Sequence, residues 1–435
     1  MKLLIKNGRL FSPYQNIDQT MDILIVDGII EKIAPRIDSA GARIIDAAKL
    51  TIVPGFIDMH THLREPGKED AETIQSGARA AAAGGFTAIA CMPNTNPVND
   101  NSGITKYILS RARDEACIDV FPVAAVSMNL KGEQITEFND LREAGAVAFS
   151  DDGNPIANNV LMRNALEYVK MFNMPIIDHC EDKTLSGTGC MNEGYYSTIM
   201  GLKGMPAESE EIMVARDIAL ARLTKGHVHI AHISCKESVK LVRQAKKEGI
   251  KITTEVTPHH FILTDEYVYK SSYDPNTKMN PPLRSKEDVD EIIKGIKDGT
   301  IDVIASDHAP HKYEDKMVEY DRAAFGIIGL ETTLPLSINF LVHKKIIELQ
   351  RLVEMFTINP AKILRLPIPA IEEKKLATLT VIDMSKKITV HAQSFFSKSR
   401  NTPFDGWPLK GCPVLTIARG NIVHELVPAA THRSP

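Results

Sequence analysis

Cysteine is scarce in this sequence, and its placement gives no sign of a structural role. The chain contains 6 cysteines, none of which forms a CxxC pair or follows the spacing of a disulfide-rich domain. They occur at Cys91, Cys117, Cys180, Cys190, Cys235 and Cys412. We therefore expect reduced thiols and a cytoplasmic protein.

Long apolar runs and an excess of one charge are also missing. No apolar run approaches the length of a membrane span, and Met1–Gly8 is too short and too interrupted by lysine for a secretory signal. The formal net charge of -4 argues against a surface that attracts nucleic acid. With 435 residues, 43% of them hydrophobic and 24% charged, the sequence predicts a soluble enzyme with one large and one smaller domain.

Two histidines at the end of an apolar run are the most informative feature that is present. The run Thr51–Met59 is short and rich in β-branched residues, which predicts a buried strand, and His60 and His62 follow it. Side chains two residues apart on a strand point to the same face. Because neutral imidazole is a common zinc ligand, this pair would supply half of a metal site.

The middle of the chain alternates apolar strands with helical stretches, which favours a (β/α)8 barrel of the TIM type. Besides the run that ends at His62, the predicted strands are 86–92, 120–126, 146–149, 174–178, 228–231, 252–256 and 302–305. The predicted helices include 71–84, 160–172, 209–223, 236–248 and 285–297. Seven polar residues lie at or just beyond the ends of six of these strands: His60, His62, Asn94, Asp152, His179, His232 and Asp307. Those ends meet at one mouth of such a barrel, where active sites are built.

The two flanks of the chain look different from its middle. Residues 1–50 and 367–435 contain short strands with turns between them, and we expect both ends to pair into one small β-sandwich beside the barrel at 51–366. His227 and His229 begin a predicted strand, so we expect them at the opposite end of the barrel in a structural role.

The histidines and aspartates at the strand ends predict a centre for two divalent ions, which would activate water to hydrolyse an amide, an imide or a cyclic ureide. Asp307 could both bind metal and shuttle the proton, whereas Asp152, which precedes Gly153, could instead be only a turn residue. Arg64 offers a planar fork for a carboxylate. Asn94 could add a hydrogen bond, and Asn280 and His311 lie in loops at the same mouth.

Several motifs make the chain resemble the dihydroorotase branch of the amidohydrolase superfamily, in its bacterial class I form. The motifs are Gly55–Gly67, Met92–Thr95, Ala305–His311, Gly326–Thr332 and Asn401–Gly406. The resemblance implies a zinc-dependent enzyme with one or two ions, two being favoured. Its reaction would be the reversible cyclisation of N-carbamoyl-L-aspartate to L-dihydroorotate in pyrimidine synthesis. The resemblance also implies a homodimer and an association with aspartate transcarbamoylase, and no nucleic acid or membrane partner.

Carried over from the family, the metal ligands are His60, His62, Asp152, His179, His232 and Asp307, and Asp307 is the catalytic residue. The substrate contacts are Arg64, Asn94, Asn280, His311, Phe325 and Gly326. Many relatives bridge their metals with a carbamylated lysine, which is absent here, so we place the bridge on Asp152, with Asp151 as the rival. A second departure is Ala324, where the family pattern predicts proline.

Three alternatives stay open. A hydantoinase or allantoinase would use the same metals on another cyclic ureide, although the aspartate in place of lysine and the pair Arg64 and Asn94 argue against it. A non-catalytic dihydroorotase-like partner of aspartate transcarbamoylase should have lost ligands, and none is missing. An acyl-amino-acid deacylase has no feature here that identifies it.

Overall fold

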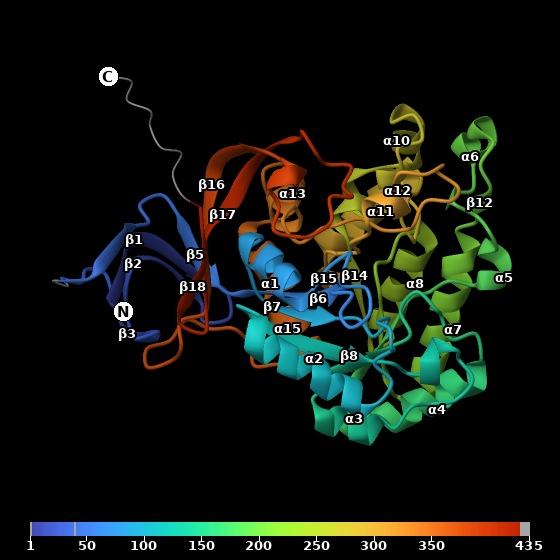
Figure 1. Cartoon of the computed structure of the whole chain (residues 1–435), viewed down its shortest axis with the longest axis horizontal. Coiled ribbons are helices and arrows are strands. Elements are labelled where there is room, and N and C mark those ends of the chain that lie inside the picture. Colours follow the sequence, from blue (N-terminus) through green and yellow to red (C-terminus); the bar gives the residue numbers. More distant parts are fainter. Residues whose placement is uncertain (1, 39–40, 427–435) are drawn as a thin grey trace.

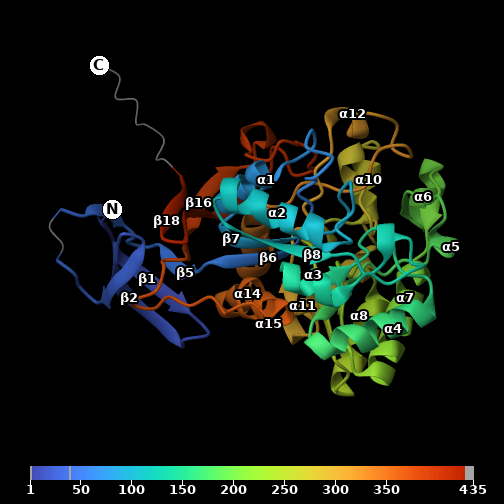
Figure 2. The same cartoon turned by 60° about the horizontal axis from the view of Figure 1, so that its bottom comes forward.

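The predicted barrel is present. The computed structural model describes residues 2–38 and 41–426. Eight parallel strands follow one another around it, as Figures 1 and 2 show from two sides. They are β6 (Phe56–Thr61), β7 (Phe86–Cys91), β8 (Asp119–Ala124), β9 (Ala148–Ser150), β10 (Pro175–Asp178), β13 (His227–Ile230), β14 (Ile252–Val256) and β15 (Val303–Ile304). The circle closes just beyond β15, where His308 bridges to Thr61 of β6.

Helices cover the outside of this barrel. The long ones are α1 (Ile74–Ala83), α2 (Ser102–Glu115), α3 (Phe138–Ala144), α4 (Asn159–Val169), α7 (Glu208–Thr224), α8 (Lys236–Lys247), α11 (Lys286–Asp298), α14 (Leu349–Phe356) and α15 (Ile358–Leu364). Helix α1 shows why they start where they do: the Thr73 hydroxyl accepts a hydrogen bond from Ser76 N, and Gly84 ends the helix. No helix in the described ranges is both long and apolar enough to cross a bilayer.

Short elements rise from the C-terminal ends of the strands and surround the mouth. They are α5 (Lys183–Ser186), β11 (Met191–Asn192), α6 (Tyr195–Met200), β12 (Gly204–Met205), α9 (Pro258–Ile262), α10 (Asp265–Lys270), α12 (Tyr313–Lys316) and α13 (Thr333–Ser337). The remaining elements are short helical turns between the others: η1 (Met128–Leu130), η2 (Lys170–Phe172), η3 (Pro275–Thr277), η4 (Ile338–Val342) and η5 (Ala392–Ser394).

Strands from both ends of the chain pair with one another, as predicted, in a second sheet beside the barrel (Figure 1). Its strands are β1 (Lys2–Ser12), β2 (Ile17–Val26), β3 (Ile29–Ala34), β4 (Arg43–Asp46), β5 (Thr51–Pro54), β16 (Leu379–Thr389), β17 (Pro408–Ala418) and β18 (Asn421–Glu425). All eight strands are connected by hydrogen bonds in one mixed sheet, to which both ends of the chain contribute. Residues from β1, β2, β3, β5, β16 and β17 bury one shared apolar core.

The run Thr51–Met59 is two strands, which corrects the prediction of one. Its first part, β5, pairs with β1 and β16 in the terminal sheet, and its second part, β6, pairs with β7 in the barrel. Gly55 separates them, and a Cβ atom there would lie 2.1 Å from Thr87 Oγ1. Every residue of both strands is buried, so apolar character alone gave no sign of the change of sheet.

Candidate metal centre and active site

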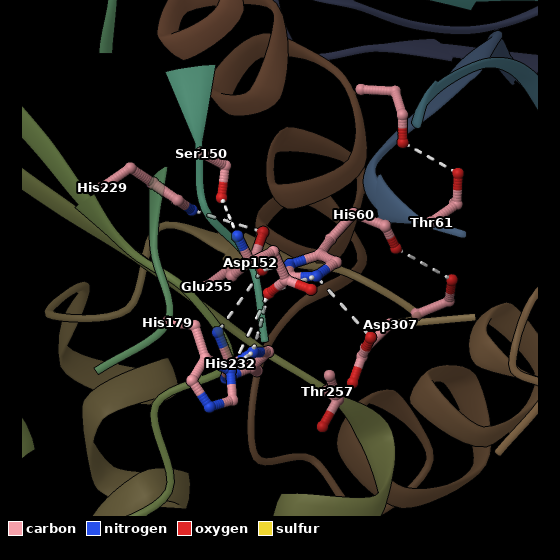
Figure 3. Close-up of polar contacts among 12 residues, drawn as sticks. His60, Thr61, Ser150, Asp152, His179, His229, His232, Glu255, Thr257 and Asp307 are labelled. Atoms are coloured by element: carbon pink, nitrogen blue, oxygen red, sulfur yellow. Dashed lines mark hydrogen bonds and ion pairs between the residues drawn. The ribbon is translucent and has the colours of Figure 1, made fainter. Parts of the chain in front are cut away.

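Six polar side chains from five barrel strands converge at the C-terminal mouth of the barrel. His60 and His62 come from the end of β6, and the others follow β9, β10, β13 and β15: Asp152, His179, His232 and Asp307. Five of them are labelled in Figure 3, where they point toward one another. All six are at most 8% exposed. The structure thus brings together the residues for which the sequence predicted metal binding.

Asp152 lies in the middle of the four histidines. Its Oδ1 is 3.4 Å from His60 Nε2, 3.6 Å from His232 Nε2 and 3.8 Å from His179 Nδ1. Its Oδ2 is 3.5 Å from His62 Nε2. One carboxylate therefore reaches both halves of the cluster, which is the arrangement that a bridging ligand requires.

Asp151 faces away from this cluster. Its Oδ1 accepts hydrogen bonds from the backbone N–H groups of Val126 (2.8 Å) and Ser127 (3.0 Å), and its Oδ2 accepts one from the Ser127 hydroxyl. Asp151 thus anchors the loop that follows β8. Burial raises its pKa to about 6.

Asp307 completes the other half of the cluster. Its Oδ1 is 3.1 Å from His62 Nε2 and 3.6 Å from His60 Nε2. Two sets of donor atoms are close enough to share an ion, His60 with His62 and Asp307, and His60 with Asp152 and His232. The imidazole and carboxylate donors suit zinc and similar divalent ions.

Unsatisfied buried atoms support the presence of a cation. His60 Nε2 and Asp152 Oδ1 face each other, are inaccessible to solvent, and have no hydrogen-bond partner. A buried polar atom without a partner costs free energy, and native structures rarely contain one. A divalent ion between these atoms would satisfy both, so the residues present fit the metal that the family implies.

The charges of the cluster reinforce one another. Burial disfavours the charged imidazolium of His60, but the carboxylates of Glu255 and Asp152 outweigh this and raise its pKa well above the usual value. Burial likewise favours neutral Asp307, but the hydrogen bond from His62 and the charges of His60 and His62 hold its pKa below the usual range. The same opposition lowers the pKa of Asp152. Without a metal ion, these pKa shifts favour a protonated His60 and ionised carboxylates at Asp152 and Asp307.

Three of the histidines have an acceptor on the nitrogen that points away from the cluster. His60 Nδ1 donates to Glu255 Oε1 (2.5 Å), His62 Nδ1 to Asn94 Oδ1 (2.9 Å), and His179 Nε2 to Glu181 Oε2 (3.1 Å). Such partners fix the orientation of a ring and leave its other nitrogen free to bind. Sequence reasoning missed Glu255 and Glu181. Glu181 could have been found two residues after His179, whereas nothing in the local sequence marks Glu255.

A cavity of about 290 Å³ opens above the cluster, and the predicted substrate residues line it. They are Arg64, Asn94, Asn280, His311, Phe325 and Gly326. Asn280 Nδ2 donates to Glu181 Oε2 (3.0 Å), and Arg64 Nε donates to Pro310 O (3.1 Å). The mouth thus offers fixed donors and the guanidinium of Arg64 next to the metal ligands.

Side chains of His311 and Lys316 hold the loop that carries Phe325 and Gly326 by hydrogen bonds to its backbone. His311 Nε2 donates to Phe325 O (2.7 Å), and Lys316 Nζ donates to Ala324 O (2.8 Å) and Gly326 O (3.0 Å). Burial lowers the pKa of Lys316 to about 7 and that of His311 to about 3. Ala324 N donates to Asp315 O (2.9 Å), a bond that the proline of the family pattern could not form.

Three residues of the site adopt positive φ angles, which are unusual for side-chain-bearing residues. The values are +61° at Arg64, +27° at His232 and +46° at Asp307. Such backbone is strained and persists where the surrounding structure fixes it. Here it turns three side chains at strand ends into the mouth.

Comparisons with known proteins give one consistent result. A family model described as Dihydro-orotase-like matches residues 49–238. A dihydroorotase of Pelotomaculum thermopropionicum is 51% identical over 423 residues, covering 97% of this chain and 98% of that protein. One of Syntrophus aciditrophicus is 49% identical over 427 residues, covering 98% of this chain and all of that protein. Among solved structures, an L-hydantoinase (dihydropyrimidinase) from Arthrobacter aurescens superposes with a TM-score of 0.86 at 26% identity, over 98% of this chain and 96% of that chain.

Proposed function

The chain belongs to the dihydroorotase family, and we propose that it is a dihydroorotase, which interconverts N-carbamoyl-L-aspartate and L-dihydroorotate in pyrimidine synthesis. The observation that carries the proposal is the meeting of Asp152 and Asp307 with four histidines beside Arg64. The chain is about half identical to named dihydroorotases over nearly its whole length.

The proposed metal ligands are His60, His62, Asp152, His179, His232 and Asp307, and the proposed metal is zinc, with two ions bridged by Asp152. Support comes from the donor types and from the unsatisfied buried atoms His60 Nε2 and Asp152 Oδ1. When bound, the ions would polarise the ring amide carbonyl and lower the pKa of the attacking water. Side chains of this protein would perform the remaining steps, which are proton transfer and substrate binding.

Asp307 is the proposed proton shuttle. Its carboxylate borders both the histidine cluster and the cavity. In the hydrolytic direction it accepts the proton of the attacking water and donates it to the leaving ring nitrogen. In the synthetic direction it accepts the ureido proton as that nitrogen attacks the carbon of the protonated carboxyl group, and it returns this proton to the hydroxyl oxygen that leaves as water. A carboxylate held ionised by neighbouring histidines is a suitable acceptor for the first step.

Arg64 and Asn94 are the proposed contacts of the substrate carboxylate, together with Asn280 and His311. Arg64 is the cation of this group. Its guanidinium lies with His311 on the same wall of the cavity, with Arg64 Nη2 3.5 Å from His311 Nε2. Phe325 and Gly326, which lie next to His311, would meet the pyrimidine ring.

Hydantoinase activity is the second candidate, because a hydantoinase shares the fold at a TM-score of 0.86. Its sequence identity of 26% is about half that of the dihydroorotases. Turnover of the zinc-loaded enzyme with dihydroorotate, hydantoin and allantoin separates the candidates. We expect turnover of dihydroorotate alone. Faster turnover of hydantoin or allantoin would refute the proposal.

The assembly and location of the protein stay predictions. We propose a homodimer in the cytoplasm that associates with aspartate transcarbamoylase, on the ground of the family alone. Light scattering of the purified chain, with and without that enzyme from the same cell, tests both associations.

A further inference from the structure

A line of buried polar side chains runs from the metal cluster into the barrel. It starts at His60, passes through Glu255 and His229, and ends at Thr253 and His227 (the first three are labelled in Figure 3). The successive contacts measure 2.5 Å, 3.3 Å, 2.8 Å and 2.8 Å. Barrel interiors of this type are usually filled by branched apolar residues. A continuous line of polar side chains in that position is therefore unusual and suggests a function.

The hydrogen positions along this line follow from Glu255, because an ionised carboxylate can only accept. His60 Nδ1 and His229 Nε2 must then both carry hydrogen, since each donates to one oxygen of Glu255. An imidazole that donates through Nε2 alone has its lone pair on Nδ1, so with this tautomer of His229 the Thr253 hydroxyl donates to Nδ1 and in turn accepts from His227 Nε2. Every member of the line has one consistent role.

A histidine that binds a metal ion is neutral, so with its hydrogen on Nδ1 His60 would present the lone pair of Nε2 to the ion. That nitrogen faces Asp152 Oδ1 at 3.4 Å and Asp307 Oδ1 at 3.6 Å, where the proposed metal binds. Glu255 Oε1 also accepts from the backbone N–H of His232 at 3.4 Å, so one carboxylate contacts two of the proposed ligand residues. His60, His229 and Glu255 are each 0% exposed, so no water competes for these bonds.

We infer that Glu255 is a positioning residue that, supported by His229 and Thr253, keeps the hydrogen of His60 on Nδ1 and leaves Nε2 free to bind metal. The inference rests on the proposed function, which makes His60 a ligand. Glu255 touches neither substrate nor metal and acts through the ring of His60.

The test compares metal affinity in two pairs of matched variants. Glu255→Gln places an amide between two imidazoles: its oxygen can accept from one ring, but its NH2 group cannot accept from the other. Glu210→Gln is its control, because Glu210 is also a buried glutamate but contacts Ser234 and Cys235 instead of a proposed ligand. Thr253→Val removes the distal support, and Thr254→Val is its control on the same strand, since the Thr254 hydroxyl donates only to backbone oxygens.

We expect Glu255→Gln to weaken zinc binding by about 10- to 100-fold, the usual range for lost partners of metal ligands. Thr253→Val should weaken it less, and both controls should match the wild type. Zinc dissociation constants from competition with a chelator measure this. The visible absorption spectrum of the cobalt-substituted proteins should change in Glu255→Gln and not in Glu210→Gln.

Wild-type zinc affinity and an unchanged cobalt spectrum in folded Glu255→Gln would overturn the inference. If circular dichroism shows that this variant does not fold, Thr253→Val decides, and affinity equal to that of Thr254→Val overturns it. A metal-binding measurement on His60→Ala distinguishes failure of this inference from failure of the proposed function. If that variant keeps its metal, the proposed site itself is wrong.

Discussion

The metal cluster has two unlike sides, and each side holds one histidine with a glutamate. On the inner side, Glu255 contacts His60 and His229 and is 0% exposed. On the outer side, Glu181 contacts His179 but also Lys183 at 2.8 Å, and both line the cavity. A histidine paired with a glutamate is thus fully buried on the inner side and lines the cavity on the outer side. From this difference we propose that the inner residues position the metal ligands and that the outer residues contact the substrate.

Removing a ligand that both sides depend on should have the largest effect. We expect His60→Ala or His62→Ala to lose most bound metal, because one missing imidazole opens the coordination shell. Turnover should fall by more than the roughly 10²-fold expected for a lost acid–base group. Metal analysis and a dihydroorotate assay check this, with His391→Ala as the control, since His391 is exposed and lies outside the cluster. Full metal content in a variant that combines His60→Ala with His62→Ala would contradict the proposed site.

Asp307 tests whether binding and proton transfer can be separated. Asp307→Asn keeps one oxygen ligand but removes the proton acceptor, so we expect metal content near that of the wild type and a rate loss of about 10²-fold or more. Metal analysis with steady-state kinetics gives both values. Should the variant keep nearly its full rate, the shuttle would pass to another group, with His311 next in line.

Arg64 tests the outer side alone. We expect Arg64→Met to lower kcat/KM for dihydroorotate by about 1.5–3 kcal/mol, or about 10- to 150-fold, since a charge-assisted contact is lost. A neutral ring analogue without the carboxylate should be much less affected, and zinc affinity should not change. Equal losses for both substrates would mean that Arg64 supports the fold instead.

Lys316, which donates to the backbone of the loop that carries Phe325 and Gly326, tests stability instead of activity. Burial lowers its pKa from 10.5 to about 7, so between these pH values the unfolded chain binds more protons than the folded one. The free energy of unfolding should therefore rise from pH 7 toward pH 10.5, by less than about 1.4 kcal/mol for each pH unit. Denaturant titrations of Lys316→Met should lack this rise, while those of Lys297→Met, which changes an exposed lysine, should retain it. Parallel pH curves for Lys316→Met and the wild type would show that Lys316 remains charged.

The sequence predicted the barrel and the residues that converge at its mouth for a physical reason. Buried parallel strands are short apolar runs, and polar residues directly after such runs stand out, as His179 and His232 do. The pattern could not show where one run changes sheets, because β5 and β6 are equally buried. It also could not distinguish Asp151 from Asp152, since the direction of each carboxylate depends on the loop at Val126 and Ser127.

The partners of the ligands were harder to predict than the ligands. Glu255 lies inside an apolar strand, and its link to His60 joins residues 195 positions apart. His227 and His229 were predicted to be structural residues at the far end of the barrel. The structure places both on β13, where they also join the polar line that reaches His60. Only three-dimensional pairing reveals such a role.

The passage of one peptide segment through two sheets also affects how the protein is made. Strand β6, with His60, leaves the ribosome early, whereas β16, which pairs Thr380 with Val53 of β5, leaves near the end of synthesis. His308, which closes the barrel against Thr61, also comes late. Contacts between such distant segments form only after a large loss of chain entropy. A nascent chain therefore contains every proposed ligand before the sheet that pairs with β5 exists, and we expect the proposed metal site to be loaded only after translation.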